Sequence, residues 1–179
     1  MKTITQLIKD SEKIDLTGAD INAITHGEAH IMSYDELHKY DTIDQVFGNK
    51  DAIILLYQTR QNYGHWVCLI RQSNDHLSFF DSYGFKLDQE LKYADYNLRI
   101  HEGVTVPHLT HLIQQSNYQV SSNTRKLQSF AKDVNTCGRF SALRVRLRHL
   151  TNDQFDRLFL NQKETPDYLV SSLTIIYSL

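Results

Sequence analysis

Three side chains spread along this sequence could together cleave an amide bond. His65, Asp81 and Cys137 supply, in that order, a base, an acid that can orient it, and a thiol that can attack a carbonyl carbon. The local pattern places His65 at the start of an apolar strand, Asp81 at the end of the next strand, and Cys137 at the start of a helix. A thiol at a helix N-terminus beside an imidazolium has a lowered pKa, so the nucleophilic thiolate is populated near neutral pH. The set indicates the chemistry of a cysteine protease.

The surroundings of Cys137 fit a reactive position, although a buried structural cysteine is the ordinary alternative. Polar Asn135 and Thr136 precede it and Gly138 follows it, which is typical of a junction between a loop and a helix. Gly138 would also leave room for a substrate backbone to approach closely. Cys68 differs because it lies within an apolar strand, and we expect it to be a packing residue.

His65 and Asp81 have ordinary alternatives as well. A histidine at a strand end is commonly a surface residue, and an aspartate there commonly begins a turn. If the two strands are neighbours, however, the carboxylate can fix the tautomer of the imidazole and stabilise its charged form. The combination of His65, Asp81 and Cys137 is therefore more specific than any of the three alone.

An α+β domain is expected to position these residues. Capping boxes predict helix starts at 33–36, 42–45 and 151–154, Gly48 ends the second of these helices, and Thr165-Pro166 begins a last one. Strands are predicted at 52–57, 65–71, 77–81 and 118–120, and helices at 107–115 and 137–150, the latter amphipathic. The run 52–57 suggests a central strand covered on both faces, and the turn 72–75 joins the next two strands as a hairpin. We thus predict a small, mainly antiparallel sheet packed against helices.

Length and composition predict a single domain over residues 1–179. Seven Gly and two Pro among 179 residues argue against a flexible linker. The formal net charge of −2 predicts neither nucleic-acid nor membrane binding, and no stretch approaches the roughly 18 apolar residues of a spanning helix. With two cysteines a disulfide framework is not indicated, which favours a reducing, intracellular compartment. We expect a monomer.

The motifs around these residues resemble a known family. Gly64-His65-Trp66, then a strand ending in Phe80-Asp81-Ser82-Tyr83-Gly84, then Cys137-Gly138 opening a helix, resemble the cysteine peptidases that include adenovirus proteinase and the SUMO proteases. The apolar strand before His65 and the segment 31–37 look most like the compact maturation proteases of virophages and large DNA viruses. The similarity covers about residues 25–150. It implies a papain-like fold of the adenain type and no cofactor.

The resemblance also implies a role for individual residues. His65 is the general base, Asp81 its partner, and Cys137 the nucleophile. Gln128 is implied as an oxyanion-hole donor together with the backbone N–H of Cys137, although nine positions separate the two, more than is usual in the family. Trp66 is implied to line a narrow channel that accepts small residues, usually glycines, before the scissile bond.

Two groups of histidines could suggest metal chemistry instead. His26, Glu28 and His30 superficially resemble a zinc site, but a glycine stands where the metalloprotease motif needs a glutamate directly after its first histidine. We therefore predict no metal there. His108 and His111 share a helix face without a third ligand and are expected on the surface.

Four arginines make the helix after Cys137 locally basic. Arg139, Arg144, Arg146 and Arg148 flank its apolar stripe on both sides. The preferred interpretation is a solvated face. Because DNA activates the adenovirus branch of the resembled family, contact with a nucleic acid activator is the alternative.

The leading hypothesis is a virus-encoded cysteine endopeptidase that cleaves capsid or other structural precursor proteins during virion maturation. It would act in the virion and the host-cell cytoplasm, and cleavage at glycine-containing sites is implied by the family only. The first alternative is a protease that removes SUMO or ubiquitin-like modifiers with the same residues. The second is a non-catalytic interaction domain on the same fold, against which the intact triad argues.

Overall fold

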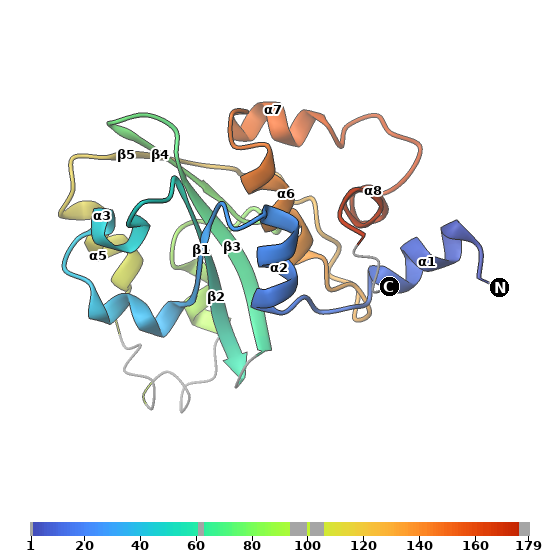
Figure 1. Cartoon of the computed structure of the whole chain (residues 1–179), viewed down its shortest axis with the longest axis horizontal. Helices are drawn as coiled ribbons and strands as arrows, with labels where there is room; N and C mark the ends of the chain where they lie inside the picture. Colours follow the sequence, from blue (N-terminus) through green and yellow to red (C-terminus); the bar gives the residue numbers. More distant parts are fainter. Residues whose placement is uncertain (1, 61–62, 94–99, 101–105, 176–179) are drawn as a thin grey trace.

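A mixed five-stranded sheet lies at the centre of the computed structural model, which describes residues 2–60, 63–93, 100 and 106–175 (Figure 1). The strands follow one another in sequence order: β1 (His30–Ser33), β2 (Ala52–Arg60), β3 (Tyr63–Arg71), β4 (His76–Phe80) and β5 (Gln119–Ser122). The pairs β2–β3 and β3–β4 are antiparallel, whereas the edge strands β1 and β5 run parallel to their neighbours. The α+β class is confirmed, with an antiparallel centre and parallel edges.

Helices cover both faces of this sheet (Figure 1). One side carries α2 (Gly18–Thr25), α6 (Cys137–Arg146), α7 (Asn152–Arg157) and α8 (Pro166–Leu173). The other carries the 3₁₀ helix η1 (Tyr34–Lys39), α3 (Ile43–Phe47) and α5 (His108–Gln114). The helix α1 (Ile4–Ser11) packs against α8, and a second 3₁₀ helix, η2 (Gln89–Tyr93), follows β4. In the described residues no helix has the length and apolar character needed to cross a membrane.

Side-chain alternation along β2 explains why both faces are covered. Ile54 packs into the core beneath α6, whereas Ile53 and Leu55 pack into the core beneath η1, α3 and α5. All three side chains are fully buried. The prediction of a central strand covered on both faces is therefore confirmed.

The predicted helix starts occur where the capping residues stand. Thr42 accepts a hydrogen bond from the backbone N–H of Gln45 at 3.2 Å, and the Gln45 side chain accepts one from the backbone N–H of Thr42 at 3.2 Å. Thr151 caps α7 in the same way, and Gly48 ends α3 with a φ of +57°. The box at Ser33 begins a 3₁₀ helix instead of an α-helix.

Two strand boundaries differ from prediction in a way that matters for the site. β3 begins at Tyr63, so His65 lies inside the strand, and β4 ends at Phe80, so Asp81 is the first residue beyond it. The pairing of β3 with β4 begins at Cys68, which lies opposite Phe80, the last residue of β4. β3 therefore extends past the end of β4, and His65 and Asp81 meet where this extension begins.

The helix that begins at Cys137 is not amphipathic, which corrects our expectation of a solvated arginine face. All residues from Cys137 to Val145 are buried, including two arginines. Arg139 donates to the carbonyl oxygens of Ser11 (3.2 Å) and Thr174 (2.9 Å), which ties α1 and α8 to α6. Arg144 donates to the Asn152 side chain (3.1 Å) and to the carbonyl of Leu150 (2.9 Å). A buried guanidinium is tolerated here because its donors are satisfied by the backbone and neighbouring amides.

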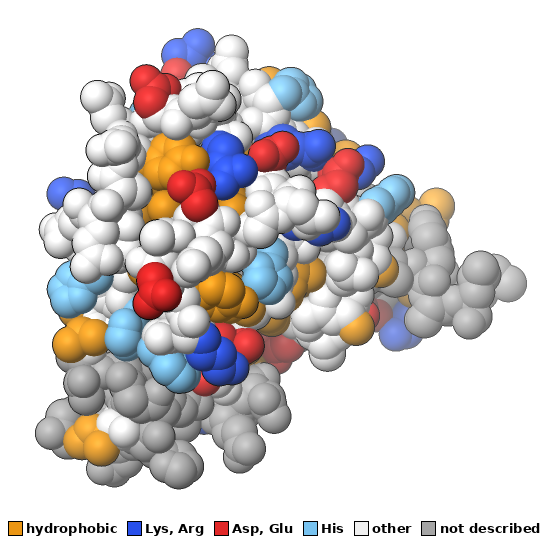
Figure 2. Space-filling view, turned by 60° about the vertical axis from the view of Figure 1, so that its left-hand side comes forward, with side chains coloured by type: hydrophobic (Ala, Val, Ile, Leu, Met, Phe, Trp, Pro, Cys, Tyr) orange, Lys and Arg blue, Asp and Glu red, His pale blue; other side chains and the backbone are white. Residues whose placement is uncertain are grey.

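The other two arginines of this region are paired. Arg146 and Arg148 both contact the Glu28 carboxylate, at 3.0 and 2.9 Å. The α6 arginines therefore do not form an exposed basic stripe. On the face seen in Figure 2, acidic and basic side chains lie interspersed, with no broad area of one charge.

Candidate active site

Cys137 is the first residue of α6, so the predicted helix start at Cys137 is confirmed. Thr136 is the N-cap residue, so the sulfur lies beside the unpaired N–H groups that open the helix. Cys137 is 8% exposed and lines a pocket of about 390 Å³ together with His65 and Gln128. A helix N-terminus stabilises negative charge on a group placed there.

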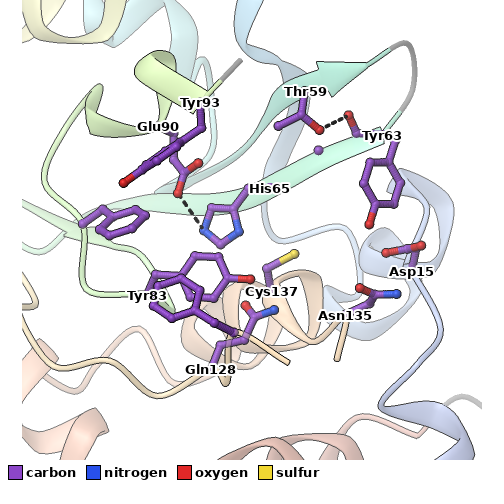
Figure 3. Close-up of a pocket in the computed structure, with 13 residues that line it drawn as sticks. Asp15, Thr59, Tyr63, His65, Tyr83, Glu90, Tyr93, Gln128, Asn135 and Cys137 are labelled. Carbon is purple, nitrogen blue, oxygen red and sulfur yellow. Dashed lines mark hydrogen bonds and ion pairs between the residues drawn. The ribbon is translucent and has the colours of Figure 1, made fainter. Parts of the chain in front are cut away.

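The His65 imidazole lies between the thiol and a buried carboxylate. Its Nε2 is 3.1 Å from Oδ1 of Asp81, a residue with no solvent exposure. The other ring nitrogen, Nδ1, points toward Cys137 (Figure 3). Burial lowers the pKa of His65, but the charge and hydrogen bond of Asp81, together with Cys137, outweigh burial and raise it well above 6.5. The geometry thus favours an imidazolium beside the thiol.

Asp81 is fixed by its own neighbours. Its Oδ1 accepts the backbone N–H of Tyr83 at 2.6 Å. Its backbone N–H donates to the Asn123 side chain at 2.9 Å, and the Asn123 amide donates back to the Asp81 carbonyl at 2.7 Å. Asn123 lies just beyond β5 and was not predicted, because no local pattern distinguishes it from other loop asparagines.

Gln128 lies in the same pocket as Cys137 despite the nine residues between them. Backbone N–H groups of Leu127 and Gln128 donate to the carbonyl of Ser82 at 2.8 and 3.0 Å, so this segment is anchored to the end of β4. The Ser82 hydroxyl donates to Oε1 of Gln128 at 2.7 Å. With its oxygen held in this way, Gln128 presents its amide NH₂ below Cys137 (Figure 3) and donates to Val134 O at 3.3 Å.

A carboxylate from α8 holds the loop between Gln128 and Cys137. Asp167 accepts the backbone N–H of Ser129 at 3.0 Å and the hydroxyl of Thr136 at 2.5 Å, and so contacts both ends of this loop. Burial raises the pKa of Asp167, against the lowering effect of these two hydrogen bonds. Asp167 was also missed from sequence, since it lies far along the chain in an unremarkable helix start.

A second buried carboxylate, which no sequence pattern indicated, faces His65. Oε1 of Glu90 lies 3.8 Å from Nε2 of His65, on the side that also faces Asp81. Glu90 is 6% exposed. Among the described residues, neither Oε1 of Glu90 nor Oδ2 of Asp81 has a hydrogen-bond partner. Burial raises the pKa of Glu90 to about 7, although the His65 charge lowers it. Glu90 is therefore expected to titrate in the range where the site would operate.

We expect Glu90→Gln to change the pH profile of any His65-dependent activity. Loss of a negative charge near Nε2 should lower the pKa of the His65 imidazolium, so the basic limb of kcat/KM should move down by about 1–3 pH units. An inflection near pH 7, caused by Glu90 itself, should disappear. Asp153→Asn removes an exposed carboxylate on α7 and should leave the profile unchanged. Identical profiles for wild type and Glu90→Gln would show that Glu90 does not influence the base.

Among the described residues, one cluster of side chains has the composition and spacing to hold a metal ion. It consists of His65, Asp81 and Glu90, whose possible ligand atoms lie within 4.8 Å of one another. The histidines of 26–30 are placed differently. His26 adopts a left-handed conformation at the end of α2, and Nδ1 of His30 lies 2.6 Å from the carbonyl of Val46. Glu28 is engaged by the two arginines described above.

Trp66 lines a second pocket, of about 260 Å³, that Cys137 also lines. Its indole Nε1 donates to the carbonyl of Leu16 at 3.1 Å, which fixes the ring. Gly138 has a different role from the one we expected. A Cβ at this position would lie 3.2 Å from both Trp66 Cδ1 and Leu16 Cβ. The small size of Gly138 therefore permits α6 to pack against Trp66, and the space beside it is core and not open to a substrate.

Sequence comparison relates the chain to a virophage protein. No protein-family model matches it. Over 172 residues it is 37% identical to the uncharacterized protein V9 of Sputnik virophage, an alignment that covers 94% of this chain and 98% of V9. The chain belongs to the V9 family. The V9 family thus provides a viral relative of nearly equal length.

Solved structures relate the V9 family fold to a viral protease. Two crystal structures of the African swine fever virus (ASFV) pS273R protease, one with selenomethionine, align with TM-scores of 0.50. Identities are 14% and 12%, and the alignments cover 92% and 97% of this chain and 68% and 74% of the protease. At such identities the likeness shows a shared fold alone. It supports the predicted viral-protease fold and does not single out the adenain group.

Proposed function

We propose that this protein is a cysteine endopeptidase that cleaves capsid or other structural precursor proteins during virion maturation. The observation that carries the proposal is the placement of His65 between a buried Asp81 and Cys137 at the start of a central helix. The viral relative and the fold shared with a viral protease support the viral context. The proposal includes a monomer that acts in the virion and the host-cell cytoplasm, with nucleic acid as a candidate activator.

In the proposed first step, the Cys137 sulfur attacks the scissile carbonyl carbon and forms a carbon–sulfur bond. The carbonyl electrons move to oxygen, and the resulting oxyanion collapses as the carbon–nitrogen bond breaks. His65, as imidazolium, gives its Nδ1 proton to the leaving amine. Asp81 stabilises the imidazolium and fixes the ring through Nε2.

The second step hydrolyses the thioester. Neutral His65 takes a proton from water at Nδ1, the hydroxide oxygen bonds to the acyl carbon, and Cys137 leaves as thiolate. The imidazolium and thiolate are thereby restored. In both steps the Gln128 amide and the Cys137 backbone N–H are the proposed donors to the oxyanion.

Trp66 supports a preference for small residues before the scissile bond. Its ring is held by Leu16 and borders the pocket on one side of Cys137. A fixed indole there would exclude bulky side chains from a narrow passage. The same feature would suit the removal of ubiquitin-like modifiers that end in glycines, which is the second candidate function.

Two substrate classes separate these candidates. We would incubate the protein with capsid precursors of the virus that encodes it, and in parallel with SUMO and ubiquitin conjugates, and compare products with those of Cys137→Ala. Cleavage of the precursors alone is the expected result. Cleavage of the conjugates alone would favour deconjugation. If neither substrate class is cleaved, a non-catalytic interaction domain is favoured.

Gln128→Ala should lower kcat about 10²- to 10³-fold with little change in KM, because the oxyanion bond matters mainly in the transition state. Gln128→Glu should be worse, since a carboxylate would repel the oxyanion. Steady-state kinetics on a cleavable peptide is the measurement.

Three exposed glutamines provide matched controls: Gln114, Gln115 and Gln119. Each should tolerate alanine without loss of kcat. Wild-type turnover by Gln128→Ala would remove Gln128 from the oxyanion hole.

A further inference from the structure

One side of the catalytic pocket is a wall of aromatic rings that the proposed bond cleavage does not use. This aromatic wall consists of Tyr83, Phe85, Tyr93 and Phe130. Phe130 is 59% and Tyr93 is 55% exposed. Exposed large aromatic side chains gathered in a pocket are typical of a binding surface, because covering them releases water from apolar area.

The rings of the aromatic wall hold one another in place. Tyr83 and Phe130 stack with centroids 4.4 Å apart, and Phe85 and Tyr93 stack at 5.6 Å. Tyr83 also stacks on the His65 ring at 4.6 Å and an interplanar angle of 14°. The wall is therefore preorganised and continuous with the proposed base, which reduces the entropy lost when a ligand binds.

The aromatic wall lies on the leaving-group side of the proposed reaction. The pocket that contains the wall is lined by His65, whereas the pocket beside Trp66 is lined by Cys137 but not by His65. Because His65 must protonate the leaving amine, the segment that leaves extends over His65. It therefore runs along Tyr83, which stacks on the His65 ring, and along the Phe130 ring that stacks on Tyr83 (Figure 3).

Two ammonium groups flank the wall. Nζ of Lys126 lies 3.8 Å from the centroid of the Phe130 ring, and Nζ of Lys92 lies 4.9 Å from that of Tyr93. Both lysine side chains are exposed, and their charges lie beside the wall through these ring contacts. An apolar floor with cationic edges complements a bulky apolar side chain next to an acidic one.

We infer that the aromatic wall is a substrate subsite for a large apolar or aromatic side chain within the first two residues after the cleaved bond. Lys126 and Lys92 favour an acidic residue next to that side chain. The inference rests on the proposed protease function and adds to it a preference on the leaving side. Substrate choice is then two-sided, with small residues beside Trp66 and a bulky one beside Phe130.

The test uses three quenched-fluorescence peptides that share Gly-Gly before the intended cleavage point and continue with Phe-Asp, Gly-Asp or Phe-Lys. We expect kcat/KM to be about tenfold higher for Phe-Asp than for Gly-Asp, as burial of one aromatic ring predicts. Phe-Lys should lie between them. In Phe130→Ala the ratio of kcat/KM for Phe-Asp to that for Gly-Asp should fall toward one. Leu158→Ala, which shortens an exposed apolar side chain at the C-cap of α7, should keep this ratio.

A binding measurement separates this inference from the proposed function. Fluorescein-labelled versions of the same peptides are titrated into Cys137→Ala, and Phe130→Ala is added in the same background. Tighter binding of the Phe-Asp peptide that is lost with Phe130→Ala supports the subsite, whether or not the wild-type protein cleaves the peptides. Failure of the wild-type protein to cleave any of the peptides would count against the protease proposal alone. Equal affinity for Phe-Asp and Gly-Asp overturns the subsite, whether or not cleavage occurs.

Discussion

Cys137→Ala should abolish cleavage, with a loss of about 10⁶-fold in kcat, because no other group can form the acyl intermediate. The residue lines the proposed catalytic pocket, and its backbone lies in the first turn of α6, where alanine is well tolerated. The folded state should therefore survive the change. Product formation followed by mass spectrometry, with circular dichroism to verify folding, is the measurement.

Cys68 is the matched control for this prediction. It lies fully buried in β3, and burial raises its pKa to about 12, partly offset by Arg144. Cys68→Ala should retain most activity and lose about 1 kcal/mol of stability through the cavity that it leaves. If Cys68→Ala were inactive while Cys137→Ala still cleaved, the assignment of the nucleophile would be wrong.

His65→Ala should be nearly inactive, and Asp81→Asn should lower kcat about 10²- to 10⁴-fold. The asparagine can still accept the Tyr83 N–H, but it removes the charge that raises the pKa of His65. Because the Asp81 charge raises the pKa of His65 in the native protein, removing this charge should lower that pKa. The basic limb of the pH profile should then move to lower pH. The measurement is kcat/KM against pH for both variants and wild type.

Residues of the same types on the β3–β4 hairpin serve as controls. His76 contacts the Ser121 hydroxyl at 2.9 Å, and Asp75 is exposed in the turn. His76→Ala and Asp75→Asn should leave both kcat and the pH profile unchanged. A profile of Asp81→Asn that coincides with that of wild type would mean that the carboxylate does not act through His65.

The sequence predicted the parts of the fold that depend on local physics. Apolar runs marked β2, β3 and β4, and capping boxes marked the starts of η1, α3 and α7. The positions of His65, Asp81 and Cys137 relative to these elements followed from strand and helix ends. The meeting of His65 and Asp81 required only that β3 and β4 be neighbours, which the short turn between them made the natural expectation. The approach of Cys137 depends in addition on the packing of α6 against β3.

What could not be predicted depends on contacts between distant segments. Arg139 and Arg144 appear in the sequence as a polar helix face, yet carbonyls of Ser11, Thr174 and Leu150 satisfy them in the core. A charge pattern alone cannot reveal such partners. The pattern therefore predicts an amphipathic helix, whereas α6 is buried from Cys137 to Val145.

The supporting residues of the site were hidden for the same reason. Glu90 reaches His65 from a 3₁₀ helix that has no distinctive pattern, and Asp167 reaches the loop before Cys137 from α8. The spacing of Gln128 is understandable once Ser82 is seen to hold it. The distance along the chain to Cys137 matters less than this anchor to the end of β4.

The most direct test of a peptide-cleaving Cys137 is a covalent probe with two glycines followed by a vinyl sulfone. Such a probe places an electrophile where the scissile carbonyl would lie and reacts with an activated thiolate. We predict one probe per molecule on Cys137 near neutral pH, located by peptide mass mapping, and no adduct in His65→Ala. A folded wild-type protein that stays unlabelled, that is labelled on Cys68, or that reacts no faster than His65→Ala would contradict the assignment.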